Sequence, residues 1–348
     1  MKIFSLTALI LIIFFKTGNV LSKDSIFNVN NIEIIKKSNV SNQEMANQAI
    51  KTGFELLKKK ILLQKDFKKL SELSFSEIKE LVSYYQVQNL NKKLKNQELF
   101  IYNISFDKDK LHNLFYINNI AYAEITNKEI FLLPIFLKDN EINLYNNNYF
   151  YNKWNLNSEN KLVEFILPLE NIETIQKINS QKNDLFNLDL KNLYPEYNGK
   201  NLALVFIEDN NSKSEKIFLK TKFLEKDIDK SLSIKRSSLN QEEFYAKIIK
   251  VINEELISLL KLQNLIDIKT PSFLNTKFNV NTKNNLVDLE ERIKKIDLID
   301  QVYVQKFNKD FVILKIKYLG KLDKIIKQLE NQKIFLRLKD DEWSIKLV

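Results

Sequence analysis

Hydrophobic and polar positions follow two different periods along residues 273–348. Apolar residues with strand-like alternation are predicted to form strands at 273–280, 302–304, 312–318, 334–338 and 343–348. Apolar residues spaced by three and four predict two helices, through Leu286, Leu289, Ile293 and Ile296 and through Leu322, Ile325, Ile326 and Leu329. The order βαββαβ predicts a ferredoxin-like unit with both helices on one face of an antiparallel sheet, and a last short strand follows it.

The mature N-terminal part, residues 23–156, shows the same two periods. Strands are predicted at 27–34, 100–106 and 130–137. A capping box of Ser41 and Glu44 precedes a helix with one apolar stripe, formed by Ala46, Ile50, Phe54, Leu57 and Ile61. Ser74 and Glu77 are expected to cap a second helix, which carries Ile78, Leu81 and Tyr85. Asp107 is expected to cap a third helix. These elements predict an N-terminal α+β domain.

A middle α/β segment is predicted at 157–239, with a strand at 162–167 and a hairpin of 203–207 with 217–223. Residues 240–272 are predicted to form a long helix, capped by Asn240 and Glu243, and a connector. With the ferredoxin-like domain at 273–348, the expected fold class is α+β, built from several small antiparallel-sheet modules.

The first 22 residues have the form of a secretory signal peptide. Lys2 precedes an apolar run at 3–15, and Val20 and Ser22 supply small residues for cleavage after Ser22. The alternative is an uncleaved anchor, but the run is shorter than the roughly 20 residues that span a bilayer. We therefore expect a periplasmic protein.

Composition narrows the classes of partner that we expect the chain to bind. The 348 residues hold no cysteine and carry a formal net charge of +10, which favours an anionic partner. The export signal and the near absence of arginine argue against a nucleic acid partner. The arginines of the chain are Arg236, Arg292 and Arg337. We expect no nucleic acid partner, and we keep peripheral membrane contact as an alternative.

Few residues point to catalysis. His112 is the only histidine, so the chain has no His-pair metal site, and we expect its side chain to be half-exposed on a helix. The paired acids, such as Asp340 with Asp341, Glu290 with Glu291 and Asp107 with Asp109, each suit a turn, a solvated helix face or a helix cap. We expect no enzyme activity, no metal and no cofactor.

Aromatic residues supply the candidate binding surface. Tyr149, Phe150, Tyr151 and Trp154 lie close together in sequence, and exposed rings of this kind stack on sugars or polypeptides. The alternative is a short amphipathic helix that docks its rings on the core. We name Tyr149, Tyr151, Trp154 and Trp343 as the candidate surface.

Several of these segments resemble an uncharacterised exported proteobacterial family with a domain of unknown function. They are the strand and capped helix at 27–62, the step Ser105-Phe106-Asp107, the strand Leu133-Pro134-Ile135 and the run 302–329 with Tyr318-Leu319-Gly320. The resemblance implies a location in the cell envelope and carries no catalytic residue.

We expect a non-catalytic exported envelope protein that binds another envelope protein, for example by adding a strand to an open sheet edge. The hairpin of 340–348 is the expected docking edge. The alternatives are a binder of cell-wall glycan or of an anionic lipid surface, and a carboxylate-based hydrolase.

Overall fold

The computed structural model describes residues 25–36, 40–94, 97–125, 127–139, 141–157, 162–209, 214–236, 239–280, 283–308, 310–339 and 342–348. The signal peptide predicted at 1–22 lies outside these residues. The chain is a mixed α+β protein that divides into two compact units. Unit 1 takes its residues from Met1–Lys59, Asp66–Ala121 and Ile266–Val348, and unit 2 from Lys60–Lys65 and Tyr122–Leu265. In the described part of the chain, no helix is both long and apolar enough to cross a membrane.

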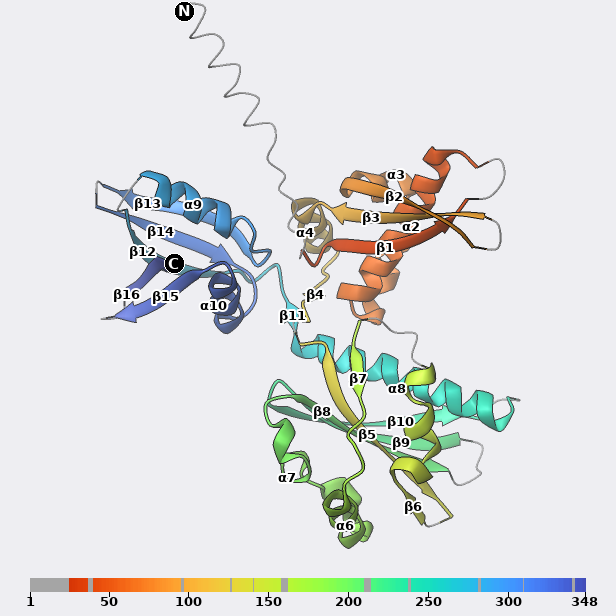
Figure 1. The fold of residues 1–348 in the computed structure, drawn as a ribbon. Coiled ribbons are helices and arrows are strands. Elements are labelled where there is room, and N and C mark those ends of the chain that lie inside the picture. Colours follow the sequence, from red (N-terminus) through yellow and green to blue (C-terminus); the bar gives the residue numbers. More distant parts are fainter. Residues whose placement is uncertain are drawn as a thin grey trace, which may run out of the picture. The chain divides into compact units, whose positions relative to one another are not determined.

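The N-terminal module of unit 1 is a three-stranded antiparallel sheet with helices (Figure 1). Its elements are β1 (Asn28–Ile35), α2 (Asn42–Ile61), η1 (Gln64–Leu70), α3 (Phe75–Glu80), β2 (Val82–Leu94), β3 (Gln97–Phe106) and α4 (Lys108–Ile117). The strand order is β1-β3-β2, so that β3 is central and β2 is an edge strand of the described sheet.

Helix α2 packs closely on this sheet at Gly53. A Cβ atom added at Gly53 would lie 2.9 Å from Cδ1 of Ile104 and 3.0 Å from Cδ1 of Ile32. The missing side chain therefore lets the helix approach β1 and β3. The predicted capping box is confirmed, because the Glu44 backbone N–H donates to Ser41 Oγ at 3.2 Å and the Ser41 N–H donates to the Glu44 carboxylate at 2.8 Å.

The second predicted helix is shorter than expected. Its capping box of Ser74 and Glu77 is present, but α3 ends at Glu80 with Leu81 as C-cap. Tyr85, which we assigned to this helix, lies on strand β2 and pairs with Ile104 of β3. The run from Val82 to Val87 is rich in β-branched and aromatic residues, and pairing with β3 outweighs the helical spacing that follows the cap.

The C-terminal module of unit 1 contains the predicted order of strands and helices. Its elements are β12 (Ser272–Asn279), α9 (Lys283–Ile293), β13 (Ile299–Phe307), β14 (Phe311–Tyr318), α10 (Leu322–Asn331), β15 (Ile334–Lys339) and β16 (Glu342–Leu347). The sheet order is β13-β14-β12-β16-β15. The last strand therefore lies inside the sheet, parallel to β12 and antiparallel to β15, and is not the open edge that we expected. The edges of the described sheet are β13 and β15.

Among the described residues, only one face of this C-terminal sheet is covered. Leu274, Thr276 and Phe278 of β12 are buried, whereas Phe273 and Asn275, which alternate with them, are exposed. Both helices contribute buried apolar side chains, Leu289 and Ile293 from α9 and Ile325 and Leu329 from α10. Since the sheet has one buried face, both helices lie on that face, as the ferredoxin-like prediction requires.

Unit 2 is organised around a six-stranded sheet of order β10-β9-β8-β5-β6, in which β7 also pairs with β5. Its strands are β5 (Glu129–Lys138), β6 (Glu141–Asn143), β7 (Glu164–Ile166), β8 (Asn201–Asp209), β9 (Ser214–Phe223) and β10 (Lys226–Lys235), and the two short strands β4 (Tyr122–Ala123) and β11 (Leu265–Ile266) pair separately. Its helices are η2 (Tyr145–Asn147), α5 (Tyr149–Lys153), η3 (Asn155–Asn157), α6 (Ile172–Ser180), η4 (Lys182–Asn187), α7 (Leu190–Leu193), η5 (Pro195–Tyr197) and α8 (Gln241–Gln263).

The predicted boundary between residues 156 and 157 does not separate two domains. Strand β5 from the first predicted domain pairs in parallel with β7 and β8 from the second. A connection between parallel strands requires a long crossover, so strands distant in sequence become neighbours in the sheet. The long helix α8, predicted as a separate connector, also belongs to unit 2.

Both faces of the unit 2 sheet are buried. On one face, side chains of α8 such as Phe244, Ile248 and Ile252 pack with Val205 of β8. On the other face, Leu204 of β8 packs in a second cluster, together with residues of α6 and α7. Strand β8 is accordingly buried along almost its whole length, which is typical of a strand with both faces covered.

Candidate functional site

The aromatic residues predicted as a binding surface belong mostly to the core. Phe150 on α5 and Trp154 directly after it are fully buried, and Tyr149 and Tyr151 on α5 are half-buried. The Tyr151 hydroxyl donates to the Pro168 carbonyl at 2.9 Å. The structure thus matches the alternative that we left open, because α5 docks its rings on the core. Trp343 is half-buried on β16 and shares the covered side of the sheet with Ile345.

His112 is buried and not half-exposed as expected. Its side chain lies edge-on to the Phe27 ring, with 5.6 Å between ring centroids. Burial, with a smaller contribution from the Lys108 ammonium, lowers the pKa of His112 to about 4. The imidazole is therefore neutral at pH 7 and packs as part of the core of the N-terminal module.

The acid pairs noted in the sequence have structural positions. Asp107 caps α4, because the Lys110 N–H donates to its carboxylate at 3.0 Å. Glu290 is exposed and forms an ion pair with Lys294 at 2.6 Å, one helical turn away. Asp340 and Asp341 lie outside the described residues. None of these acids that the structure describes lies in a buried pair.

A pair of buried carboxylates that sequence reasoning missed lies in unit 2. Asp209 at the end of β8 and Glu215 at the start of β9 are each 1% exposed, and the Arg236 guanidinium lies 3.2 Å from both. The Tyr245 hydroxyl donates to Asp209, and Arg236 also lies over the Phe244 ring, 4.9 Å from its centroid. The sequence offered only a weak signal, which is that Asp209 directly follows the apolar run of β8.

This cluster connects three strands and the first turn of α8. Burial, and then the hydrogen bond to Asp209, raise the pKa of Tyr245 to about 12. The tyrosine therefore stays protonated and keeps donating to the carboxylate at neutral pH. Because Arg236 and Tyr245 occupy the Asp209 carboxylate, this arrangement suits a structural role better than general acid–base catalysis.

Lys261 of α8 is another buried ionisable residue that sequence reasoning missed. Its Nζ donates to the Leu62 carbonyl at 2.8 Å, which holds the chain segment at 60–65 against α8 within unit 2. Burial lowers the pKa of Lys261 to about 8. In the described part of the chain, His, Cys, Asp and Glu side chains do not gather into groups of three or more that suit a metal ion.

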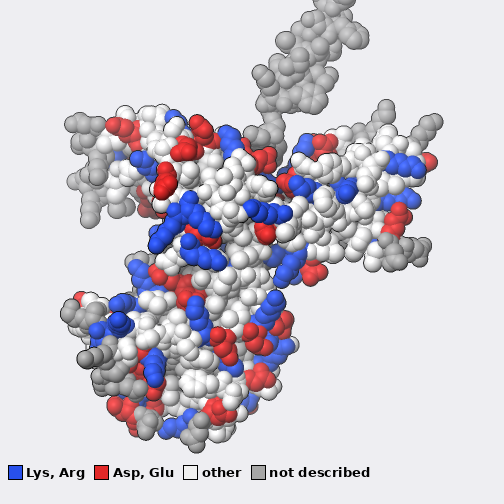
Figure 2. Space-filling view, turned by 180° about the vertical axis from the view of Figure 1, so that it is seen from behind, with Lys and Arg blue, Asp and Glu red and all other residues white. Residues whose placement is uncertain are grey.

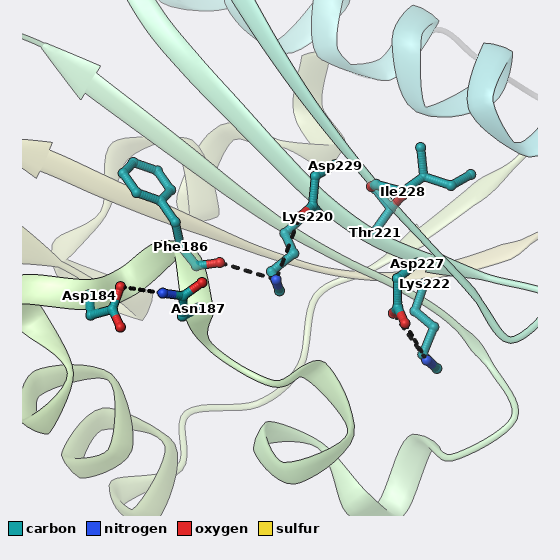
Figure 3. A network of polar contacts seen from close by, with 9 residues as sticks. All are labelled: Asp184, Phe186, Asn187, Lys220, Thr221, Lys222, Asp227, Ile228 and Asp229. Carbon is teal, nitrogen blue, oxygen red and sulfur yellow. Dashed lines mark hydrogen bonds and ion pairs between the residues drawn. The ribbon is translucent and has the colours of Figure 1, made fainter.

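The hairpin of β9 and β10 carries several ion pairs (Figure 3). The Lys222 ammonium lies 3.0 Å from the Asp227 carboxylate, and Lys220 pairs with Asp229 at 3.7 Å while donating to the Phe186 carbonyl at 3.1 Å. Most of these pairs are partly exposed, so each contributes little to stability. They place an acid beside two of the lysines of β9.

Strand β2 of unit 1 has a different character. Its residues from Val82 to Gln88 include no charged residue, and Tyr85 and Val87 are 43% and 50% exposed. Both pair with buried residues of β3, Ile104 and Tyr102, so they extend the apolar face of the sheet beyond α2. A groove of about 380 Å³ opens beside this strand and is lined by Ile50, Lys79, Val82, Ser83, Tyr84 and Tyr85.

The uncovered face of the C-terminal sheet is the second exposed surface, and we call it the open face. It carries lysines and aromatic rings from several strands, including Lys315 of β14 and Phe273 of β12. Figure 2 shows basic and acidic side chains next to one another over much of the visible side of the molecule, with one denser group of basic side chains near the middle of the view. No protein-family model, curated protein or solved structure matches the chain.

Proposed function

We propose that this chain is an exported, non-catalytic protein of the cell envelope that binds another polypeptide at the edge of strand β2. The observation that carries the proposal is the exposed, uncharged stretch of β2 beside an apolar groove. An extended segment of the partner adds as a further strand, and one of its apolar side chains enters the groove.

The stretch of β2 from Tyr84 to Gln88 lacks the features that usually prevent such pairing. Exposed edge strands are commonly protected by lysines, prolines or bulges. From Tyr84 to Asn89 the strand pairs with β3 without a register shift, and its residues up to Gln88 include neither lysine nor proline. Both β2 and β13 have two register shifts and carry lysine toward one end. The uninterrupted pairing of β2 runs from Tyr84 to Asn89, whereas that of β13 runs only from Gln301 to Val304. The β2 edge therefore offers the longer regular stretch to an added strand.

The ionisable groups favour binding over catalysis. A general acid or base at neutral pH is most effective with a pKa near 7. Burial lowers the pKa of His112 to about 4, and the Asp209 carboxylate is bound by Arg236 and Tyr245. The location in the envelope is supported by the signal-like pattern at 1–22 and by the resemblance to an exported family. Intact-mass measurement of the exported chain tests it, with Lys23 expected as the first residue.

Photo-crosslinking in cells tests the docking edge. A photoreactive phenylalanine analogue at the exposed Ser83 is expected to yield a crosslinked product with a second polypeptide. Val87→Lys on the same chain places a charge beside the pairing edge and is expected to abolish that product. The matched control is Val304→Lys on β13, where Val304 is 61% exposed, and the product is expected to persist.

Two results would contradict the proposal. One is a Ser83 crosslink whose yield is the same with and without Val87→Lys. The other is equal loss with Val304→Lys, because a general effect of added charge would then explain both. Circular dichroism of each purified variant checks that the fold is retained.

A further inference from the structure

The open face of the C-terminal sheet combines positive charge with aromatic rings. The strand register assigns its members, because residues directly opposite one another on neighbouring strands point to the same side. Phe273 lies opposite Lys317, Tyr303 opposite Lys315, and Phe335 opposite Lys346. The cations that the register places on this face are Lys277, Lys306, Lys315, Lys317, Arg337 and Lys346.

Few acids balance these cations. In the described strands, Asp300 and Glu342 are the acids on this side, and Asp300 pairs with Lys317 at 2.6 Å. The remaining cations leave a clear excess of positive charge. This contrasts with the β9–β10 hairpin of unit 2, where Lys220 and Lys222 each have an acid on the neighbouring strand.

Several lysines lie over the rings of this face. Lys315 Nζ is 4.4 Å from the centre of the Phe273 ring, and Lys277 and Lys306 are 4.6 and 5.7 Å from the centre of the Phe311 ring. Phe273 nevertheless remains 50% exposed and Tyr303 44% exposed. The lysine stems pack along apolar surface while their ammonium groups point to solvent, so charge and apolar area are presented together.

We infer that the open face binds an anionic phospholipid surface. Its lysines contact headgroup phosphates, and its exposed rings enter the boundary between headgroups and acyl chains. The cations come from all five strands, which at about 4.8 Å per strand spreads them over roughly 20 Å across the sheet. A two-dimensional array of charge matches a membrane surface, whereas a nucleic acid single strand presents its phosphates along one line.

The residue types support the same partner. Lysine is a point charge without the fork that favours bidentate phosphate recognition, and the open face holds a single arginine, Arg337. Phe273, Phe311 and Phe335 are apolar throughout and offer no hydrogen-bonding group to a base edge. The open face therefore attracts phosphate groups by charge without fixing their geometry, which suits the mixed headgroups of a bilayer.

Vesicle co-sedimentation of the full chain tests this inference. The probes are phosphatidylcholine vesicles and vesicles in which roughly a third of the lipid is phosphatidylglycerol. The difference in affinity between the two reports the anionic contribution, whatever else the chain contacts. Lys277→Gln combined with Lys315→Gln is expected to reduce the affinity for the anionic vesicles roughly 30-fold, and Phe273→Ala to reduce it further.

The matched control changes net charge equally on the other side of the module. Lys321→Gln with Lys327→Gln alters α10 and its N-cap, which lie on the covered face, and the affinity is expected to fall less than roughly threefold. Equal losses in the two double variants would overturn the inference, because net charge alone would then explain binding. A second result would also overturn the inference: the chain binds a single-stranded oligonucleotide tightly, loses this binding in the Lys277→Gln, Lys315→Gln variant, and is not retained on anionic vesicles. Oligonucleotide binding would identify the face as a nucleic acid site.

Discussion

The sheet of unit 2 and the C-terminal sheet of unit 1 use similar residues in opposite ways. In unit 2 both faces of the central strands are covered, and several cations of the sheet pair with acids, as Lys222 pairs with Asp227 and Arg236, directly after β10, pairs with Asp209. In the C-terminal sheet one face is open, and lysines such as Lys315 lie over aromatic rings. The first arrangement stabilises a fold, and the second leaves charge and apolar area at the surface.

The difference indicates where to look for function in this chain. Unit 2 contains the largest buried side chain, Trp154, and the buried carboxylates, both of which a search for functional residues would select first. These residues are committed to packing. Unit 2 also exposes apolar side chains, such as Leu156, Leu169 and Ile172, but these lie on or beside short helices. In unit 1 the exposed apolar side chains lie on sheet strands, on β2 and on the open face, and exposed apolar area of this kind often marks a binding site.

The largest expected effect is a difference in stability between removing an aromatic ring from the unit 2 core and removing one from the open face. Trp154→Ala removes a fully buried ring and is expected to lower the free energy of unfolding by about 4 kcal/mol. Phe273→Ala removes a ring that is 50% exposed, and we expect a loss below about 1 kcal/mol. Urea denaturation of both variants provides the measurement. Similar losses would show that the open face is more tightly packed than its exposure indicates.

Two arginines provide the next contrast. Arg236→Met leaves Asp209 and Glu215 buried without their guanidinium partner and is expected to cost about 3 kcal/mol. Arg337→Met on the exposed side of β15 is the control, with an expected change of less than about 0.5 kcal/mol. Denaturation midpoints at pH 7 compare the two. A small effect of Arg236→Met would mean that the buried acids take up protons readily once the arginine is absent.

A pH dependence tests whether unit 1 also has a well-packed core. The unfolded chain protonates His112 near pH 6.5, whereas burial lowers the folded pKa to about 4. As the pH falls through this window the unfolded state binds the proton first, so stability is lost, by up to about 3 kcal/mol. The stability of His112→Leu relative to the native chain is therefore expected to rise between pH 7 and pH 4. If the difference in stability between His112→Leu and the native chain stayed the same from pH 7 to pH 4, His112 would be in contact with solvent.

The smallest expected effects concern the lysines themselves. A double-mutant cycle on Lys222 and Asp227 is expected to give a coupling energy of about 0.5 kcal/mol, because the aspartate side chain is 72% exposed. A cycle on Lys315 and Phe273 is expected to give a similar value, about 0.5 to 1 kcal/mol. High salt is expected to lower the coupling energy of Lys222 with Asp227 more than that of Lys315 with Phe273. If the Lys315 pair contributed much more to stability than this, a structural role would account for the open face.

Local patterns predicted many of the elements but not their assembly. The capping boxes at Ser41, Ser74 and Asn240 marked helix starts correctly because each is a contact within one turn. The pairing of β5 with β8 could not be predicted, because it joins residues about 70 positions apart and leaves no periodic signal. The insertion of β16 beside β12 is likewise a long-range pairing.

The candidate sites were harder to predict for a related reason. A ring such as Trp154 has the same identity on a surface and in a core, so composition alone could not distinguish the two positions. The alternation of Ile313, Lys315 and Lys317 did predict a solvent-facing side of β14. The lysine and ring pairs on that side required the register of three strands. Likewise, Tyr85 was informative only after β2 was known to be a strand.

Crosslinking from matched positions in the two units tests the central claim most directly. The photoreactive analogue is placed at Ser83 on β2 in one chain and at the exposed Lys226 on β10 in another. If unit 1 presents the polypeptide-binding surface, cells will yield a crosslinked partner from Ser83 and none from Lys226. A partner captured from Lys226 and not from Ser83 would contradict the account.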